Sequence, residues 1–151
     1  MKQLGTWLGV GLMDLPQVAA DVVDLCQATG LRVVAFHGSM GAGKTTLIRH
    51  MASVLGTSDE VASPTFGLVN VYQTHSGLGI HHMDWYRVDD PAELWDAGIP
   101  ELLDSGEWCW VEWPERAESL FPRETAVLTI ERDADDAGRS VSLFSAQNDH
   151  G

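Results

Sequence analysis

The sequence predicts an α/β fold, in which helices flank a sheet of mixed parallel and antiparallel strands. A short run of β-branched and apolar residues at 32–37 predicts a buried strand, and residues 45–55 follow it with helical periodicity. Further along, strand-like runs at 67–73 and 80–86 flank the turn-like segment 75–79, which indicates an antiparallel hairpin. Strands that are joined both by a helix and by a tight turn are typical of a mixed sheet.

The N-terminal part of the chain is expected to form an edge strand at residues 6–10 and a helix from residue 14 or 15 to residue 29. Pro16 suits the first turn of that helix, and Gly30 is placed to end it. Gly56 gives the same stop signal after the helix at 45–55.

In the C-terminal half, the nearly continuous apolar run Trp108-Cys109-Trp110-Val111 predicts a central strand that is buried on both faces. The remaining expected elements are helices at 91–97, 100–103 and 114–120 and strands at 126–131 and 140–144. The length of 151 residues favours one domain over residues 1–146, followed by a disordered tail at 147–151.

Composition limits the classes of function. No apolar run approaches the length that spans a membrane, and Cys26 and Cys109 are far apart and form no metal or redox motif, so we expect a cytoplasmic protein. The formal net charge is −13, and eleven acidic residues lie between Asp84 and Glu118 against two basic ones, Arg87 and Arg116. This acidity disfavours tight, unassisted nucleic-acid binding. It either faces solvent only or suits a basic protein partner.

One glycine-rich segment carries the strongest functional signal. Between the strand at 32–37 and the helix at 45–55, the chain meets every fixed position of the phosphate-binding loop G-x-x-x-x-G-K-[ST]. Its glycines allow inward-pointing backbone N–H groups, its lysine reaches the β- and γ-phosphates, and its threonine hydroxyl is a ligand for Mg²⁺. We therefore predict a P-loop NTPase-like fold that binds a nucleoside triphosphate with Mg²⁺ through Gly38, Ser39, Met40, Gly41, Ala42, Gly43, Lys44, Thr45 and Thr46.

A phosphate loop also needs a carboxylate at the end of a neighbouring strand, and two residues qualify. Asp84 and Glu112 each end an expected strand, and each is predicted to lie at the metal ion or at the attacking water. The competing interpretations are a helix cap for Asp84 and a surface carboxylate for Glu112. Ser63-Pro64-Thr65 precedes the hairpin, where Thr65 either senses the γ-phosphate as part of a switch or belongs to a proline-fixed turn.

Three further motifs follow the phosphate-binding loop along the chain. Besides the loop itself, the chain contains Ser63-Pro64-Thr65-Phe66, His82-Met83-Asp84-Trp85-Tyr86-Arg87 and Val111-Glu112-Trp113-Pro114. From about residue 33 to about residue 141 the sequence resembles the TsaE family. That resemblance implies a small ATPase that supports the threonylcarbamoyladenosine modification of tRNA by acting on the TsaB–TsaD pair, with tRNA reached only through this complex.

The resemblance also implies roles for single residues. It places Lys44 on the phosphates, Thr45 and Glu112 at Mg²⁺, Asp84 as the catalytic aspartate, also near the metal, Trp113 and Arg139 at the nucleotide, and Thr65 in the switch. In the mechanism that follows, Asp84 orients or activates water for attack on the γ-phosphate of ATP, while Lys44 and the loop amides stabilise the developing charge. Because no arginine finger is evident, slow hydrolysis that a partner accelerates is expected.

Two other classes of function remain open from the residues. A small-molecule kinase would need an arginine-rich lid, whereas the arginines after the loop are scattered: Arg87, Arg116, Arg123, Arg132 and Arg139. A nucleotide-sensing adaptor would bind ATP to control assembly without needing hydrolysis. The chain has no Asn-Lys-x-Asp motif, which disfavours a GTPase.

Overall fold

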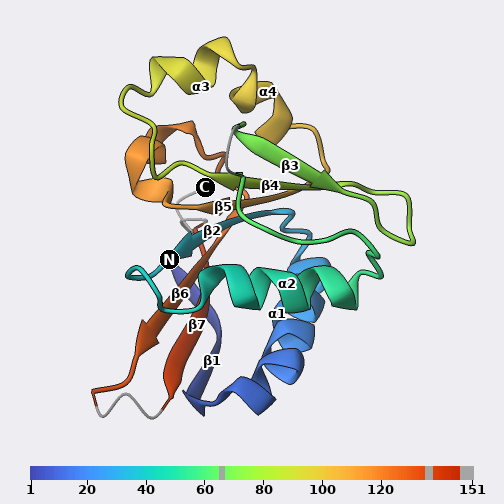
Figure 1. The fold of residues 1–151 in the computed structure, drawn as a ribbon, viewed down its shortest axis with the longest axis vertical. Helices are drawn as coiled ribbons and strands as arrows, with labels where there is room; N and C mark the ends of the chain where they lie inside the picture. The colour runs from blue at the N-terminus through green and yellow to red at the C-terminus, as the bar shows by residue number, and fades with distance from the viewer. Residues whose placement is uncertain (65–66, 135–137, 147–151) are drawn as a thin grey trace.

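In the computed structural model, residues 1–64, 67–134 and 138–146 are described, and within them seven strands form one sheet of order β1-β7-β6-β2-β5-β4-β3 (Figure 1). The strands are β1 (Lys2–Val10), β2 (Val33–His37), β3 (Val69–Tyr72), β4 (Ile80–Asp84), β5 (Trp108–Glu112), β6 (Thr125–Arg132) and β7 (Arg139–Ser145). The helices are α1 (Leu15–Thr29), α2 (Lys44–Val54), α3 (Ala92–Asp96) and α4 (Ile99–Leu103), with 3₁₀-helices η1 (Leu12–Asp14) and η2 (Pro114–Leu120).

The middle of the sheet is parallel and its edges are antiparallel. Strands β4, β5, β2 and β6 run parallel to one another, whereas β3 pairs with β4, β7 with β6 and β1 with β7 in antiparallel fashion. The predicted hairpin is confirmed, with Val69 opposite Met83 and Tyr72 opposite Ile80. The mixed α/β fold predicted from the sequence is therefore confirmed.

Side-chain alternation along the central strands divides the core between the two faces of the sheet. Val34 and Phe36 of β2 pack with α1 and α2, whereas Val33 packs in a second cluster with α3, α4 and η2. Figure 1 shows the same division, with α1 and α2 on one side of the sheet and α3 and α4 on the other. All five residues of β5 are buried, as predicted for a strand covered on both faces.

Local signals account for the helix ends near the site. Helix α1 carries its proline in the first turn and ends at Gly30, whose φ of 72° is left-handed. Helix α2 begins directly at Lys44 because Gly43 adopts φ 111° and turns the chain into the helix. Leu47 and Met51 are fully buried beneath it, and truncating Leu47 to alanine is expected to cost about 2–5 kcal/mol.

The structure differs from the sequence prediction in several elements, and β3 spans Val69–Tyr72 rather than the expected 67–73. β1 spans nine residues rather than the expected 6–10, because β7 pairs with it along its whole length. The helix expected at 114–120 is a 3₁₀-helix broken at Ala117 (φ −158°, ψ 57°). Strand β4 ends at Asp84, whose Oδ1 accepts the Tyr86 N–H at 2.9 Å and turns the chain.

Three parallel strands bring their carboxyl ends to one edge of the sheet. Phe36 of β2 and Asp84 of β4 are both in register with Glu112 of β5. Loops that follow such strand ends form the usual ligand site of open α/β sheets. Among the described residues, no helix has the length and apolar character needed to cross a membrane. The expected tail at 147–151 lies outside the described residues.

Candidate functional site

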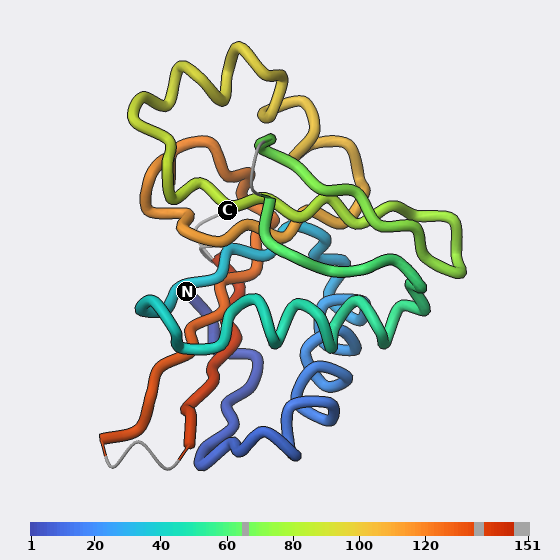
Figure 2. Tube along the Cα trace, in the orientation of Figure 1, coloured from blue at the N-terminus to red at the C-terminus, as the bar shows by residue number. Residues whose placement is uncertain are grey.

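The glycine loop leaves β2 at His37 and enters α2 at Lys44 (Figure 2). Gly41 (φ 79°) adopts a left-handed conformation that favours glycine. At Gly38 the constraint is space, because an added Cβ would lie 2.5 Å from the Ile130 carbonyl oxygen of β6. Of the two fixed glycines of the motif, Gly38 is therefore demanded by close packing on the sheet and Gly43, with φ 111°, by the backbone path.

Arg132 of β6 and Arg139 of β7 hydrogen-bond to carbonyl groups of this loop. Arg139 donates from Nε to the Ala42 carbonyl at 2.8 Å, and Arg132 donates to the Gly41 carbonyl at 3.0 Å. These charge-assisted bonds fix successive loop carbonyls. Arg139 thus lies at the loop, and the contact with a nucleotide that the resemblance implied stays a prediction.

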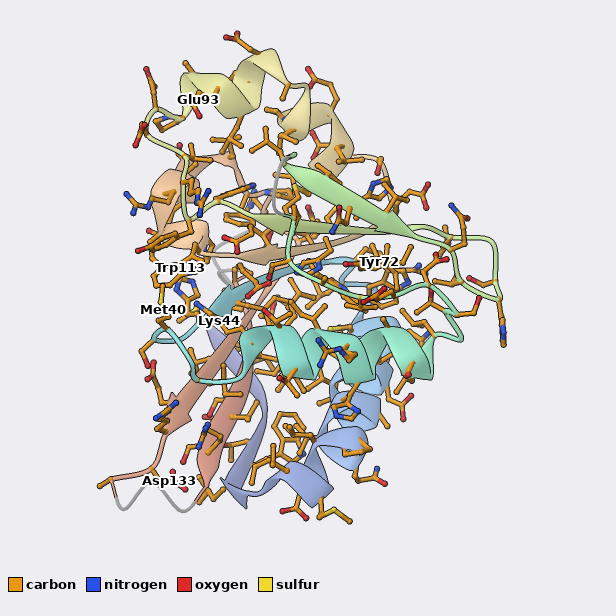
Figure 3. The ribbon with its side chains drawn as sticks, viewed as in Figure 1. Met40, Lys44, Tyr72, Glu93, Trp113 and Asp133 are labelled. Carbon is orange, nitrogen blue, oxygen red and sulfur yellow. The ribbon has the colours of Figure 1, made fainter. Side chains whose placement is uncertain are left out.

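Lys44 begins α2 and turns back into the loop. Only 5% of its surface is exposed, and its Nζ donates to the Gly38 carbonyl at 2.7 Å. The Nζ also lies 3.7 Å from the centroid of the Trp113 ring, and Figure 3 shows the two labelled side chains together near Met40. Burial lowers the pKa of Lys44, although nearby carboxylates, above all Glu112, favour its charged form.

Glu112 is the most buried carboxylate of the site, with 3% of its surface exposed. Thr45 donates to its Oε1 at 2.9 Å and Ser63 to its Oε2 at 2.9 Å, while His82 Nε2 lies 2.7 Å from Oε2. Burial alone would raise the pKa of Glu112, but the hydrogen bonds from His82, Thr45 and Ser63 outweigh it and hold this pKa below the ordinary value. The carboxylate is therefore ionised at neutral pH and is not a surface group.

The Thr45 hydroxyl oxygen and the Glu112 carboxylate suit a divalent cation. Mg²⁺ prefers hard oxygen ligands and is usually bound through one or two side chains together with phosphate oxygens and water. Thr45 offers a hydroxyl and Glu112 an ionised carboxylate oxygen within 2.9 Å of each other. The donor set therefore fits the Mg²⁺ that the sequence predicts.

Asp84 lies beside Glu112 on the next strand and is only half-buried. Burial raises the pKa of Asp84, and its hydrogen bond from the Tyr86 N–H opposes that rise. The side chain caps a turn rather than a helix, and it leaves Oδ2 without a hydrogen bond in the described structure.

A cavity of about 350 Å³ collects most of the predicted site residues: Met40, Gly41, Gly43, Lys44, Thr45, Thr46, Asp84, Glu112 and Trp113, together with Ser63. Gly38, Ser39 and Ala42 belong to the loop but not to this lining. Arg139 lines a second cavity of about 350 Å³ on the other side of Gly41, next to Val10 and Leu15. Thr65 lies outside the described residues, so its expected switch role stays a prediction.

The sequence analysis missed three residues that support Glu112. Ser63 and His82 contact its carboxylate, and Tyr72 contacts His82. A signal for His82 was present, because it stands two residues before Asp84 on one strand and alternate strand residues share a face. Nothing in the sequence pattern singled out Tyr72, since its contact depends on how the hairpin packs.

Comparisons with known proteins agree with this geometry. Residues 12–141 match the family model described as threonylcarbamoyl adenosine biosynthesis protein TsaE. The chain is 36% identical to the tRNA threonylcarbamoyladenosine biosynthesis protein TsaE of Haemophilus influenzae, over 77% of this chain and 72% of that one. It is 38% identical to the protein of the same name from Bacillus subtilis, over 77% and 71%.

The fold is similar to a solved structure as well. The crystal structure of YdiB from Bacillus subtilis superposes with a TM-score of 0.68 and 29% sequence identity, covering 97% of this chain and 88% of that chain. The family match and the shared fold both include the glycine loop and the strand ends that form the cavity. The chain belongs to the TsaE family, whose members are P-loop nucleotide-binding proteins involved in the biosynthesis of threonylcarbamoyladenosine in tRNA.

Proposed function

We propose that this protein is a Mg²⁺-dependent ATP hydrolase that supports tRNA threonylcarbamoyladenosine modification by acting on the TsaB–TsaD complex. The observation that carries the proposal is the hydrogen bond between Thr45 of the loop helix and the buried, ionised Glu112. Two oxygens of the kind that bind Mg²⁺ thus lie within 2.9 Å of each other at the start of the loop helix, which supports a metal site there. The proposed activity belongs to one domain over residues 1–146.

Binding of the triphosphate is assigned to the loop and to Lys44. The loop amides and the N-terminus of α2 favour an anion at this position. Lys44 holds its ammonium on the Gly38 carbonyl, inside the loop, where it can exchange that carbonyl for a phosphate oxygen. Trp113 borders the same cavity, with its ring over the Lys44 ammonium.

Thr45 and Glu112 would hold the metal ion, and Mg²⁺ would supply neutralisation of the charge on the phosphates. Asp84 is assigned to the nucleophilic water, because its carboxylate lines the cavity and has an oxygen free to accept a proton. The raised pKa of Asp84 supports this role, since a carboxylate with a higher pKa is a better base.

A partner is proposed to complete the site. In the described part of the chain, no arginine lines this cavity: Arg132 and Arg139 bond to loop carbonyls, and Arg87 lines a separate cavity that also includes Asp84. Without an arginine to supplement Lys44 at the developing charge, hydrolysis should be slow. The net charge of −13 favours a basic protein surface as the partner, and the cytoplasm is the compartment that this proposal implies.

The test is phosphate release from ATP and Mg²⁺ by the purified protein, alone and with the TsaB–TsaD pair of the same organism. Slow release alone and clear stimulation by the pair are expected, with both lost in Lys44→Ala. Tight ATP binding with no release in either condition would favour the nucleotide-sensing adaptor. Equal release in both conditions would contradict the partner dependence and direct attention to phosphate transfer to small acceptors, as in a kinase.

A further inference from the structure

A chain of hydrogen bonds runs behind Glu112, away from the nucleotide cavity. His82 on β4 is fully buried and places Nε2 2.7 Å from Glu112 Oε2. Its other ring nitrogen, Nδ1, lies 2.9 Å from the hydroxyl of Tyr72, which is buried on β3 (Figure 3). That hydroxyl in turn accepts the backbone N–H of Ala62 at 3.1 Å.

Each polar atom of this chain has a hydrogen-bond partner. The Tyr72 hydroxyl has one proton, which can point to His82 Nδ1 or to the Ala62 carbonyl oxygen, 2.8 Å away. That carbonyl also accepts the Asn70 amide at 2.9 Å, so it keeps a donor when the tyrosine proton points to the histidine. His82 can then accept at Nδ1 and donate from Nε2 to the carboxylate, so every buried polar atom of the chain has a partner.

The chain closes on itself through the next residue. Ser63, which follows Ala62, donates directly to the same Glu112 oxygen that His82 contacts. The segment at 62–63 is therefore tied to the carboxylate by two routes, one direct and one through Tyr72 and His82. A closed network of buried hydrogen bonds leaves the carboxylate little freedom to rotate.

Packing alone does not explain why Tyr72 and His82 are polar residues. Their rings contact each other with centroids 5.8 Å apart, and Tyr72 packs in the apolar core between the sheet and the helices α1 and α2. Phenylalanine and leucine would fill similar volumes there without polar atoms to satisfy. The polar atoms instead converge on the carboxylate that lies within reach of Thr45.

We propose that His82 and Tyr72 are positioning residues, which orient the Glu112 carboxylate toward Thr45 and so set the affinity of the site for a nucleotide-bound Mg²⁺. This inference rests on the proposed function, because it takes Glu112 as a ligand of that ion. Removing a residue that hydrogen-bonds to a metal ligand typically changes metal affinity by about 10- to 100-fold.

The test compares ADP affinity with and without Mg²⁺, measured by calorimetry on the folded full-length chain. Tyr72→Phe removes one oxygen atom, and His82→Leu removes both ring nitrogens. Each is expected to reduce the Mg²⁺-dependent gain in ADP affinity by about tenfold while leaving metal-free affinity within about twofold. His82→Gln should retain most of the gain, because its carboxamide N–H can still donate to Glu112.

The matched control is His81→Gln, the same substitution one residue earlier on β4, where the side chain points to the opposite face and contacts Glu107 instead. It should leave the gain unchanged. A merely structural role for Tyr72 and His82 would lower metal-free and Mg²⁺-dependent affinity together. An unchanged gain in folded Tyr72→Phe would overturn the proposal, and this variant carries the test if His82→Leu fails to fold.

A second measurement separates failure of this inference from failure of the proposed function. If the wild-type chain gains no affinity from Mg²⁺, the metal role of Glu112 is wrong and the positioning role falls with it. If the wild type gains affinity and Tyr72→Phe gains as much, only the positioning role is wrong. Nitrogen-15 spectra of the nucleotide-free protein should also show a proton on His82 Nε2, and an Nε2 without a proton would overturn the proposed hydrogen bond to Glu112.

Discussion

Asp84 and Glu112 occupy the same register position on the adjacent parallel strands β4 and β5, yet their environments push their pKa values in opposite directions. Glu112 is buried among three hydrogen-bond partners, and its pKa is lowered. Asp84 is half-buried beside one backbone N–H, and its pKa is raised. Paired carboxylates that differ in this way commonly have different chemical roles. The predicted division is a metal ligand at Glu112 and a water-directed base at Asp84.

Asp84→Asn should separate hydrolysis from binding. The amide cannot accept a proton from water, so phosphate release should fall by about 100-fold or more, the lower end of the usual contribution of a general base. ADP affinity should stay within about twofold, because asparagine can still accept the Tyr86 N–H and cap the turn. Asp89→Asn, at an exposed position of the same segment, is the matched control. A collapse of ADP affinity in Asp84→Asn would instead make Asp84 a metal anchor.

Lys44→Ala should weaken nucleotide binding without unfolding the chain. Loss of a charged hydrogen-bond donor is expected to weaken ATP affinity by about 10- to 100-fold. Lys2→Ala changes the other lysine of the sequence, at the exposed start of β1, and should bind ATP as the wild type does. Calorimetric titration of both variants decides the point, and wild-type affinity in Lys44→Ala would refute the assignment of the loop.

The lowered pKa of Glu112 predicts an acid-sensitive contribution to stability. Because the folded value lies below the unfolded value, this contribution is fully present above the ordinary glutamate pKa and is lost as pH falls through the folded value. Glu112→Gln should therefore lower the free energy of unfolding at pH 7 more than at pH 3. Urea unfolding at the two pH values measures the difference, and a penalty that grows toward acid pH would contradict it.

The raised pKa of Asp84 predicts the opposite pH dependence of stability. Its folded pKa lies above its unfolded value, so its favourable contribution is present below the ordinary aspartate pKa and is lost as pH rises through the folded value. Asp84→Asn should consequently be more stable, relative to wild type, at pH 7 than at pH 3. The same unfolding series tests this, and parallel curves for wild type and variant would show that the half-buried position costs the carboxylate nothing.

The elements with strong local signals could be predicted from the sequence. Helix α1 was expected with its proline near the start and its end at Gly30, and β5 was recognised from an uninterrupted apolar run. Both signals are local, since each depends on residues within one element. The full length of β1 could not be predicted, because its pairing with β7 joins residues more than 130 positions apart, such as Lys2 and Ser145.

The residues of the candidate site also include some that the sequence predicts and some that it does not. The loop and the two strand-end carboxylates follow from motif and order along the chain, and the structure brings them to one cavity. The contacts of Ser63 and His82 with Glu112 could not be predicted, because they depend on the register of β4 with β5 and on the path of the segment before β3. Sequence order predicted the loop and the candidate carboxylates, whereas the residues that hydrogen-bond to Glu112 could be identified only from tertiary packing.

Trp113 offers a prediction about backbone strain. Among the described residues it is the only one other than glycine with a positive φ, 57°. A side chain in this conformation costs about 1–2 kcal/mol, which glycine avoids. Trp113→Gly and Trp113→Ala both remove the indole, so their comparison isolates the backbone: the glycine variant should be the more stable by about 1 kcal/mol in urea unfolding. Equal stability, or a more stable alanine variant, would argue against strain.

The backbone at Trp113 also bears on attempts to make the protein more heat-resistant. Substitutions that relieve left-handed strain are a common source of thermal stability, and Trp113 is the position where such a search would begin. The indole that would be discarded lies over the Lys44 ammonium and borders the cavity. Its loss also removes the contact with the Tyr86 ring, which opposes the gain from relieved strain, so a useful screen at this position must select for ligand binding together with melting temperature.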